Sequence, residues 1–190
     1  MENIIRAVNI LKQGGIIVYP TDTVYGFGCS IFDAEAIDKI RKLKGKKGVA
    51  PFSIICSTLE EVRQCAVIDD ETFRIMQKVL PGPYTFIVNA TEKMPRFLVS
   101  TDGKVGIRIP DHPVPLEIVR QLGHPIITTS VNFTGENCFT DPQKIKEVFG
   151  DKADLIIDGG VLGIEASTIL EQTDDGVRVV RVGKGNLMSW

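Results

Sequence analysis

Apolar residues recur along this chain with two different periods that alternate from one end to the other. Ile4, Val8 and Leu11 share one helical face, the spacing of an amphipathic helix packed on a core. The run 15–19 (GIIVY) ends at Pro20, which indicates a buried strand. Along the whole chain, these periods predict helices over 3–12, between 33 and 45, from 59, over 71–80, 113–122 and 142–149, and strands over 15–19, 52–56, 84–89, 105–109, 125–130, 154–157, 167–171 and 177–182.

Residues that favour helix ends and turns support this arrangement. Asp33 precedes the second helix as a cap, and Gly45 ends that helix. Thr58 and Glu61 have the spacing of a capping box, which places a helix start at residue 59. The last two strands are joined across 174–176 in the pattern of a hairpin, so some strands should be antiparallel. We therefore predict an α/β fold, with a single domain over residues 1–190 and a twisted mixed sheet flanked by helices.

The composition is that of an ordinary globular domain. Of the 190 residues, 43% are hydrophobic and 24% charged. No window approaches the roughly 18 uninterrupted apolar residues of a membrane span, and the N-terminal segment lacks the pattern of a secretory leader. Cysteines 29, 56, 65 and 138 have no spacing typical of a disulfide framework or a zinc site. We expect a reduced, cytoplasmic protein without a leader and without a metal site of its own.

The net charge of −2 is unevenly distributed along the chain. The segment 39–47 (KIRKLKGKK) has six of the 22 basic residues and no acidic one, which leaves a balance of −8 elsewhere. That balance argues against a protein that coats nucleic acid, whereas the cationic segment favours a phosphate-bearing ligand. The alternative is a solvated helix end whose cations offset the helix dipole. That role needs fewer cations than the six in this segment.

Most patterns that identify catalytic sites are missing from the sequence. His112 and His124 each lie beside a proline at an expected helix boundary, where a structural role is favoured. The chain has no G-x-x-x-x-G-K-[ST] loop, and Gly26 and Gly28 lack the third glycine of a dinucleotide-binding fingerprint. Chemistry on this chain would therefore depend on positioning and on charge.

Three segments rich in small polar residues are expected at strand ends: 20–26 (PTDTVYG), 128–132 (TTSVN) and 166–168 (AST). Each alone is typical of an ordinary turn, but open α/β sheets bind ligands in crevices beyond strand ends. Arg108 and Arg181 lie within strand patterns, where an inward-pointing arginine needs a partner. The sequence leaves two alternatives for that partner: an acidic side chain in an internal salt bridge, or an anionic ligand.

Over essentially its whole length, the chain resembles the YrdC/YciO family of threonylcarbamoyl-AMP synthase-like proteins. The segments GGIIVYPTDTVYGFGC, VGIRIP, TTSVN, ASTIL and VVRVGKG carry the resemblance, and PGPYTFIV and DGGVLG are closer to the YciO-type branch. It implies a YrdC-like fold with a concave, positively charged cavity, without the second domain of some members. It also implies a nucleotidyltransferase that condenses L-threonine, bicarbonate and ATP and releases pyrophosphate. A tRNA-modifying partner enzyme would transfer the threonylcarbamoyl group to an adenosine of tRNA.

Carried over position by position, the resemblance also implies roles for individual residues. Lys44 and Lys46 would be catalytic, because attack on the α-phosphate needs alignment and neutralised charge more than a strong base. Mg²⁺ would enter with ATP and add to that charge. The implied threonine-binding residues are Thr23, Arg108, Thr128 and Ser167, and the implied nucleotide-binding residues are Lys44, Lys46, Ser130, Asn132 and Arg181.

Three positions depart from the family pattern. Lys46 replaces the arginine of a K-x-R motif, so a point charge replaces a planar, bidentate grip on phosphate. Ala50 stands where an asparagine is frequent, and Ile55 replaces a histidine expected near threonine. Losing one charged hydrogen bond to phosphate costs on the order of 1.5–3 kcal/mol. We therefore expect weakened synthase activity or an altered substrate.

A second function class stays open from the sequence alone. The same basic cavity would suit a non-catalytic factor in translation or ribosome assembly that binds double-stranded RNA or tRNA. Lys39, Arg41, Lys42 and Lys47 would then contact RNA phosphates, and the affinity would fall steeply with added salt.

Overall fold

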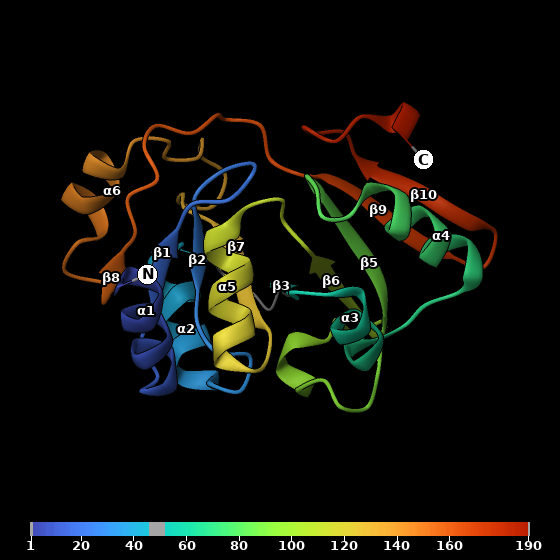
Figure 1. Ribbon diagram of the computed structural model, residues 1–190, viewed down its shortest axis with the longest axis horizontal. Helices are drawn as coiled ribbons and strands as arrows, with labels where there is room; N and C mark the ends of the chain where they lie inside the picture. Colours follow the sequence, from blue (N-terminus) through green and yellow to red (C-terminus); the bar gives the residue numbers. More distant parts are fainter. Residues whose placement is uncertain (1, 46–51, 190) are drawn as a thin grey trace.

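The structure, a computed structural model, describes residues 2–45 and 52–189. Its strands form one mixed sheet, and helices flank that sheet (Figure 1). The helices are α1 (Glu2–Lys12), α2 (Ala34–Leu43), α3 (Leu59–Cys65), α4 (Asp70–Val79), α5 (Pro113–Leu122) and α6 (Pro142–Phe149), with 3-10 turns at Arg96–Leu98 and Leu187–Ser189. The strands are β1 (Ile17–Tyr19), β2 (Gly26–Gly28), β3 (Ser53–Ile55), β4 (Ala66–Val67), β5 (Tyr84–Ala90), β6 (Lys104–Arg108), β7 (Ile126–Ser130), β8 (Leu155–Ile156), β9 (Thr168–Thr173) and β10 (Gly176–Arg181).

The strand order explains how segments far apart in the sequence meet. Across the sheet the order is β10-β9-β5-β6-β3-β7-β2-β1-β8, and β4 pairs with β5 beside this path. The pairs β3–β6, β5–β9 and β1–β8 are parallel, and the other pairs are antiparallel. The mixed α/β sheet predicted from the sequence is therefore confirmed, including the hairpin of β9 and β10.

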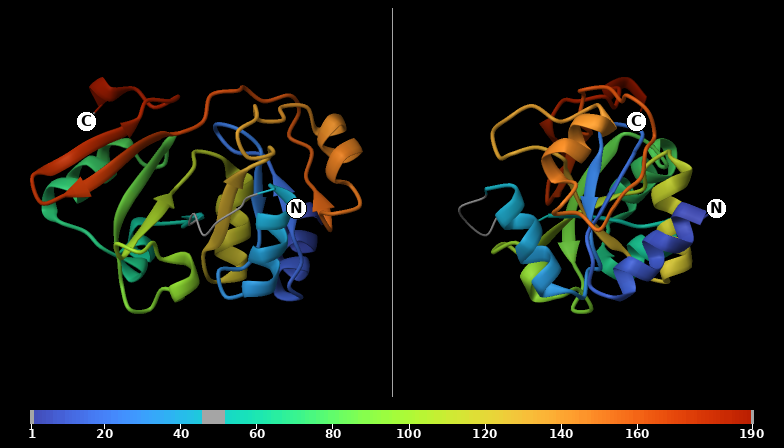
Figure 2. Two further views of the ribbon diagram at one scale, coloured as in Figure 1. Left: turned by 180° about the vertical axis from the view of Figure 1, so that it is seen from behind. Right: turned by 90° about the vertical axis from the view of Figure 1, so that its left-hand side faces the viewer.

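The helices divide between the two ends of the sheet. α1, α2 and α5 lie beside β1, β2 and β7, whereas α3 and α4 lie beside β5, β9 and β10 (Figures 1 and 2). α1 packs against α5, and α4 packs against β10. The connection 157–167, orange to red in Figure 1, runs from β8 at one end of the sheet to β9 at the other. Strands β3 and β6, at the middle of the sheet, join the two ends.

The predicted helix starts are present in the structure. The Asp33 carboxylate accepts a hydrogen bond from the Ala36 amide, and the Thr58 hydroxyl accepts one from the Glu61 amide. The Glu61 carboxylate accepts from the Ser57 amide at 2.6 Å, one residue earlier than an ideal capping box places it. Every helix predicted from the sequence is present among the described residues.

Strand β2 was missed by the sequence prediction, which assigned the region to a loop. Its two glycines lie against the ring of the fully buried Tyr19 on β1. A Cβ atom at Gly28 would lie 2.7 Å from that ring, and one at Gly26 would lie 3.2 Å from it. Glycine is depleted in strands, so the feature that allows this close approach also removes the strand signal from the sequence.

Two further expectations were wrong. The segment 166–168 enters strand β9, whereas the prediction placed it after a strand. The two-residue strand β4, which follows α3 directly, carries too few residues to show an alternating pattern. Ser167 thus directly precedes β9, close to the start of the strand predicted over 167–171.

Candidate functional site

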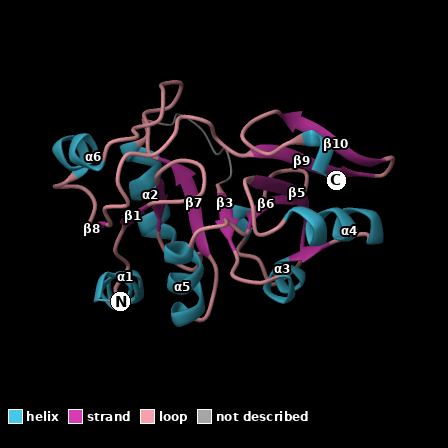
Figure 3. Cartoon of the chain, turned by 45° about the horizontal axis from the view of Figure 1, so that its top comes forward, coloured by secondary structure: helices cyan, strands magenta, loops and turns pink. Residues whose placement is uncertain are grey.

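The pairing of β3 with its two neighbours brings the polar segments together. Ser53 pairs with Gly106 on β6 and with Thr128 on β7, and residues paired in this way project from the same face of the sheet. Figure 3 shows β7, β3, β6 and β5 side by side in the middle of the sheet. The face that they share carries the candidate site.

A cavity of about 180 Å³ lies on this face. Of the residues implied by the family resemblance, Thr23, Arg108, Thr128, Ser130, Ser167 and Arg181 line it. Its remaining lining residues are Val24, Phe52, Ser53, Thr85, Thr129, Ala166 and Ile169. The structure therefore brings together residues from all three predicted polar segments and both strand arginines.

Arg108 has an internal partner. Its Nη2 donates to Asp22 Oδ1 at 2.8 Å and to the Thr23 hydroxyl at 3.1 Å. The Asp22 carboxylate also accepts from the Asp111 amide at 3.1 Å, and the Lys184 ammonium donates to the Asp22 carbonyl oxygen. Burial lowers the pKa of Arg108, and the Asp22 carboxylate opposes this shift. The salt bridge holds the guanidinium at the wall of the cavity.

Thr128 is oriented from below by a buried tyrosine. The Tyr19 hydroxyl donates to the Thr128 hydroxyl oxygen at 2.8 Å, and burial raises the pKa of Tyr19. Because Tyr19 is fully buried, its hydroxyl proton has a fixed acceptor. The Thr128 hydroxyl proton can then be donated to a ligand in the cavity.

Ser167 is held between two other lining residues. Its hydroxyl lies 2.7 Å from that of Thr85, and its carbonyl oxygen accepts from Arg181 Nη2 at 2.7 Å. Burial lowers the pKa of Arg181. The hydroxyl pair and the guanidinium of Arg181 thus form part of the cavity lining.

Lys44 is buried and holds the S-x-N segment. Its ammonium donates to the Ser130 carbonyl oxygen at 2.5 Å, to the Asn132 carbonyl oxygen at 3.2 Å and to Asn132 Oδ1 at 2.5 Å. The Ser130 hydroxyl donates to the same Oδ1 atom at 2.7 Å. Lys44 and Asn132 therefore lie behind the lining residue Ser130. Lys46 and Ala50 lie outside the described residues.

The cations proposed to contact RNA are divided. Lys39 and Lys42 are exposed on α2. Arg41, by contrast, donates to Asp38 at 2.7 Å and to the Phe97 carbonyl oxygen at 3.2 Å, and its guanidinium lies 5.5 Å from the centre of the Phe52 ring. Lys47 lies outside the described residues. Contact with RNA stays a prediction for all four.

The polar lining residues Ser53 and Thr85 were not selected from the sequence, and neither was Asp22, which bonds the lining residue Arg108. Asp22 lies inside the PTDTVYG motif, and only its contact with Arg108, far away in the sequence, identifies its function. Ser53 and Thr85 are polar residues within otherwise apolar strand patterns. This polarity in a buried strand could have identified them as candidate site residues. Both histidines have structural contacts: His112 Nδ1 accepts from the Val114 amide at 3.2 Å, and the ring of His124 packs on Phe32.

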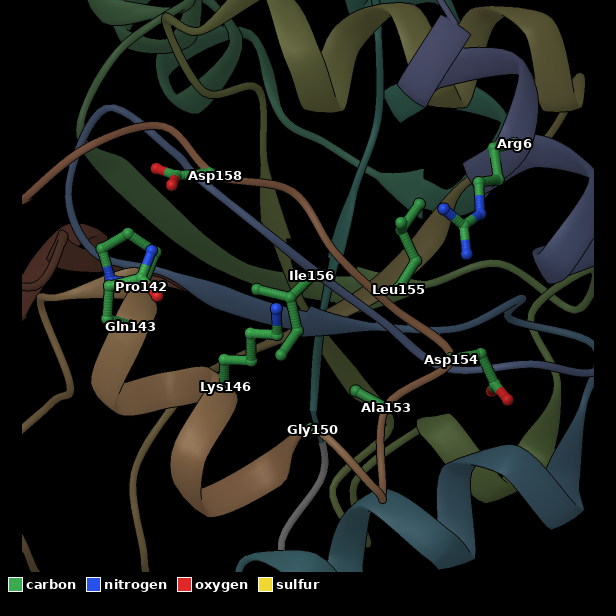
Figure 4. A pocket seen from close by; sticks show the side chains of 10 residues that line it. All are labelled: Arg6, Pro142, Gln143, Lys146, Gly150, Ala153, Asp154, Leu155, Ile156 and Asp158. Carbon is green, nitrogen blue, oxygen red and sulfur yellow. The ribbon is translucent and has the colours of Figure 1, made fainter.

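A separate hollow of about 350 Å³ lies at the β8 edge of the sheet. Figure 4 shows Lys146 of α6 and Arg6 of α1 on either side of Leu155 and Ile156. Of the residues that the family resemblance implies and the structure describes, none lines this hollow. Elsewhere, no group of three or more His, Cys, Asp or Glu among the described residues is placed to hold a metal ion. None of the helices described here is long and apolar enough to span a membrane.

Fold and cavity together define an α/β protein with a hydroxyl-lined hollow between two arginines. Residues 9–183 match the family model Sua5_yciO_yrdC, whose description is telomere recombination. The chain belongs to this Sua5/YciO/YrdC family. The match covers strands from β1 to β10 and so includes every wall of the cavity.

Similar proteins lie in two branches of the family. The protein YciO of Escherichia coli K12 is 38% identical over 184 residues, which are 96% of this chain and 89% of that one. The E. coli YciO crystal structure matches with a TM-score of 0.92 at 36% identity, covering 97% of this chain and 90% of the other. A threonylcarbamoyl-AMP synthase of Coxiella burnetii is 31% identical over 83% of this chain and 86% of its own. Pyrococcus abyssi Sua5 complexed with L-threonine gives a TM-score of 0.88 at 29% identity, covering 95% of this chain and 54% of that one.

Proposed function

We propose that this protein is a nucleotidyltransferase of the threonylcarbamoyl-AMP synthase type, which joins an amino acid and bicarbonate to ATP with release of pyrophosphate. One observation carries the proposal: a single cavity gathers two arginines and the hydroxyls of residues from five different strands or loops. Relatives at about 31% identity are named as synthases of this type, and one similar structure is a complex with L-threonine. The product would pass to a tRNA-modifying enzyme as its partner.

The geometry supports a division of labour across the cavity. On one wall, Arg108 and the hydroxyls of Thr23 and Thr128 suit the carboxylate of the amino acid, because charged donors and hydroxyls are the partners that a carboxylate requires. Arg181, in the lining of the same cavity, would neutralise charge on the α-phosphate. The reaction forms a bond between the carbamate oxygen and the α-phosphorus while pyrophosphate leaves.

Lys44 is proposed to act through the segment that it holds. Its ammonium bonds Ser130 and Asn132, which fixes the Ser130 side chain at the cavity wall. Its charge also favours phosphate in the same region. Lys46 is proposed as the second cation, and Mg²⁺ bound to the ATP phosphates would supply further charge there.

Pyrophosphate release by the purified protein tests the proposal. We expect release that requires ATP, bicarbonate and an amino acid together. Arg181→Ala should lower kcat/KM for ATP by 10-fold or more, because a charged hydrogen bond is worth about 1.5–3 kcal/mol. Arg120→Ala, on the exposed side of α5, is the matched control. Release that ignores bicarbonate, or that Arg181→Ala leaves intact, would remove the basis of the proposal.

A further inference from the structure

A second hollow adjoins the cavity on the same face of the sheet. It has a volume of about 340 Å³ and shares Phe52, Ser53, Thr85 and Ile169 with the cavity described above. It extends away from Arg108, over Gly106, toward Lys104 and Glu171. We call it the Gly106 hollow. The two spaces therefore adjoin, with residues of β3, β5 and β9 between them.

The register of the strands explains why this space is open. Gly106 pairs with Ser53 on one side and with Ile87 on the other, and Ile87 pairs with Glu171. Lys104, Gly106 and Arg108 alternate along β6, so all three project from the same face. Gly106 has no side chain, and the Ser53 side chain lies over it between the two cations, with its hydroxyl oxygen 2.5 Å from where a Cβ of residue 106 would be. On the opposite side of the Arg108 row, Ile55 pairs with Arg108 and offers a ligand no hydrogen bond.

The far end of the Gly106 hollow carries a partly buried charge cluster. The Lys104 ammonium donates to Glu171 Oε1 at 2.6 Å and to the Gln172 carbonyl oxygen at 3.3 Å. Arg178 donates to the other oxygen of Glu171, so two cations share one carboxylate. An ammonium has three donors, and Glu171 and the Gln172 carbonyl are the two acceptors of Lys104 among the described residues. The third is available to an oxygen atom of a ligand.

The length of the hollow selects a ligand. Each pair of strand residues advances about 6.6 Å, so the Gly106 row lies about 6.6 Å beyond the Arg108 row. Lys104, two further residues along, reaches back toward the Gly106 row because it bonds Glu171. An amino acid whose carboxylate is held at Arg108 needs an unbranched side chain of roughly four bonds of about 1.5 Å to reach this end. The side chain of threonine stops short of it.

We propose that the Gly106 hollow is the side-chain subsite for the substrate amino acid and takes an unbranched side chain ending in an oxygen acceptor, as in glutamate and glutamine. This inference rests on the proposed function and names its substrate class. Ser53 and Ile87 flank the aliphatic part of the side chain, and Lys104 donates to its terminal oxygen. Asp102, at the exposed end of the hollow, is bonded by the Ser100 hydroxyl at 2.5 Å.

The test measures pyrophosphate release and binding for glutamate, glutamine and threonine. With ATP and bicarbonate, kcat/KM for glutamate or glutamine should exceed that for threonine by at least 10-fold. Comparing glutamate with glutamine then shows whether the subsite prefers a carboxylate or an amide at the end of the side chain. Isothermal titration of the same amino acids in the presence of ATP should give the same order. The binding order tests the subsite even where turnover is absent.

Two variants separate the subsite from the rest of the cavity. In Gly106→Ala the new Cβ would lie 2.5 Å from the Ser53 hydroxyl oxygen, so the Ser53 side chain is displaced into the hollow and the ratio of glutamate or glutamine to threonine should fall at least 10-fold. Gly163→Ala is the matched control, because a Cβ there meets no atom within 4 Å. Lys104→Met should lower the same ratio without displacing the Ser53 side chain.

The outcomes distinguish the inference from the proposed function. Turnover with a preference for threonine, or a ratio that Gly106→Ala and Lys104→Met leave unchanged, overturns the subsite and leaves the synthase-type activity standing. Absence of turnover with every amino acid overturns the proposed function. In that case, tenfold tighter binding of glutamate or glutamine that Gly106→Ala abolishes would still support the subsite, and equal binding would overturn it.

Discussion

The salt bridge between Asp22 and Arg108 should make a large contribution to stability. The exposed fractions of the two side chains are 9% and 8%, and Nη2 lies 2.8 Å from Oδ1. Removing one member of a buried pair leaves the other charge uncompensated, at a cost of about 3–5 kcal/mol. Asp22→Asn keeps one oxygen acceptor for Arg108, so we expect the lower end, about 3 kcal/mol. At about 2–4 °C per kcal/mol for a chain of this size, Tm should fall by about 6–12 °C.

Urea unfolding of four proteins measures this contribution directly. The wild type, Asp22→Asn, Arg108→Met and the double variant form a cycle, in which the coupling free energy should be on the order of 2–3 kcal/mol. Glu117→Gln, which breaks an exposed pair with Arg120, is the control and should leave the midpoint unchanged. A coupling below about 0.5 kcal/mol, with unchanged m values, would refute the assignment of Arg108 to an internal salt bridge.

Three other predictions concern groups around the cavity and on α2. Burial lowers the pKa of His112 against the opposing effect of Asp22, so the folded protein takes up its proton at lower pH than the unfolded chain, whose value is about 6.5. Stability should therefore fall as pH drops below about 6.5, and His112→Asn, which keeps a cap acceptor, should show a smaller fall in urea midpoint. Tyr19→Phe should cost about 1 kcal/mol in urea unfolding, because it removes the hydrogen bond to Thr128; an unchanged midpoint would contradict this. If tRNA binds to α2, replacing Lys39 and Lys42 with alanine should reduce the salt dependence of binding in a filter assay.

The sequence predicted the larger elements because their signals are local. Helix α2 is an example: Asp33 provides the cap, and buried Ile37 and Ile40 repeat at helical spacing within one segment. Strand β2 could not be found in this way. Its pattern, Gly26-Phe27-Gly28, has meaning only beside the ring of Tyr19, to which it is brought by the β1–β2 pairing.

The candidate site shows the same limit at the level of side chains. Family motifs identified six of the cavity residues. A motif implies a role for each residue but does not show which side chains contact it in the folded protein. Asp22 was visible in its motif, and its function appears only when β6 places Arg108 next to it. Ser53 and Thr85 needed the register of β3 and β5 before their polarity could be assigned to a shared face.

The two strand arginines, Arg108 and Arg181, differ in the charge of their hydrogen-bond partners, which the sequence pattern alone could not show. Arg108 has a carboxylate partner, so its charge is balanced before any ligand arrives, whereas the hydrogen bonds recorded for Arg181 go to the carbonyl and hydroxyl of Ser167. Those neutral acceptors orient the guanidinium of Arg181 without cancelling its charge. An entering phosphate would therefore gain more from Arg181, and a carboxylate at Arg108 must share the guanidinium with Asp22. This asymmetry favours Arg181 as the partner of the phosphate in the proposed site and Arg108 as the partner of the amino-acid carboxylate.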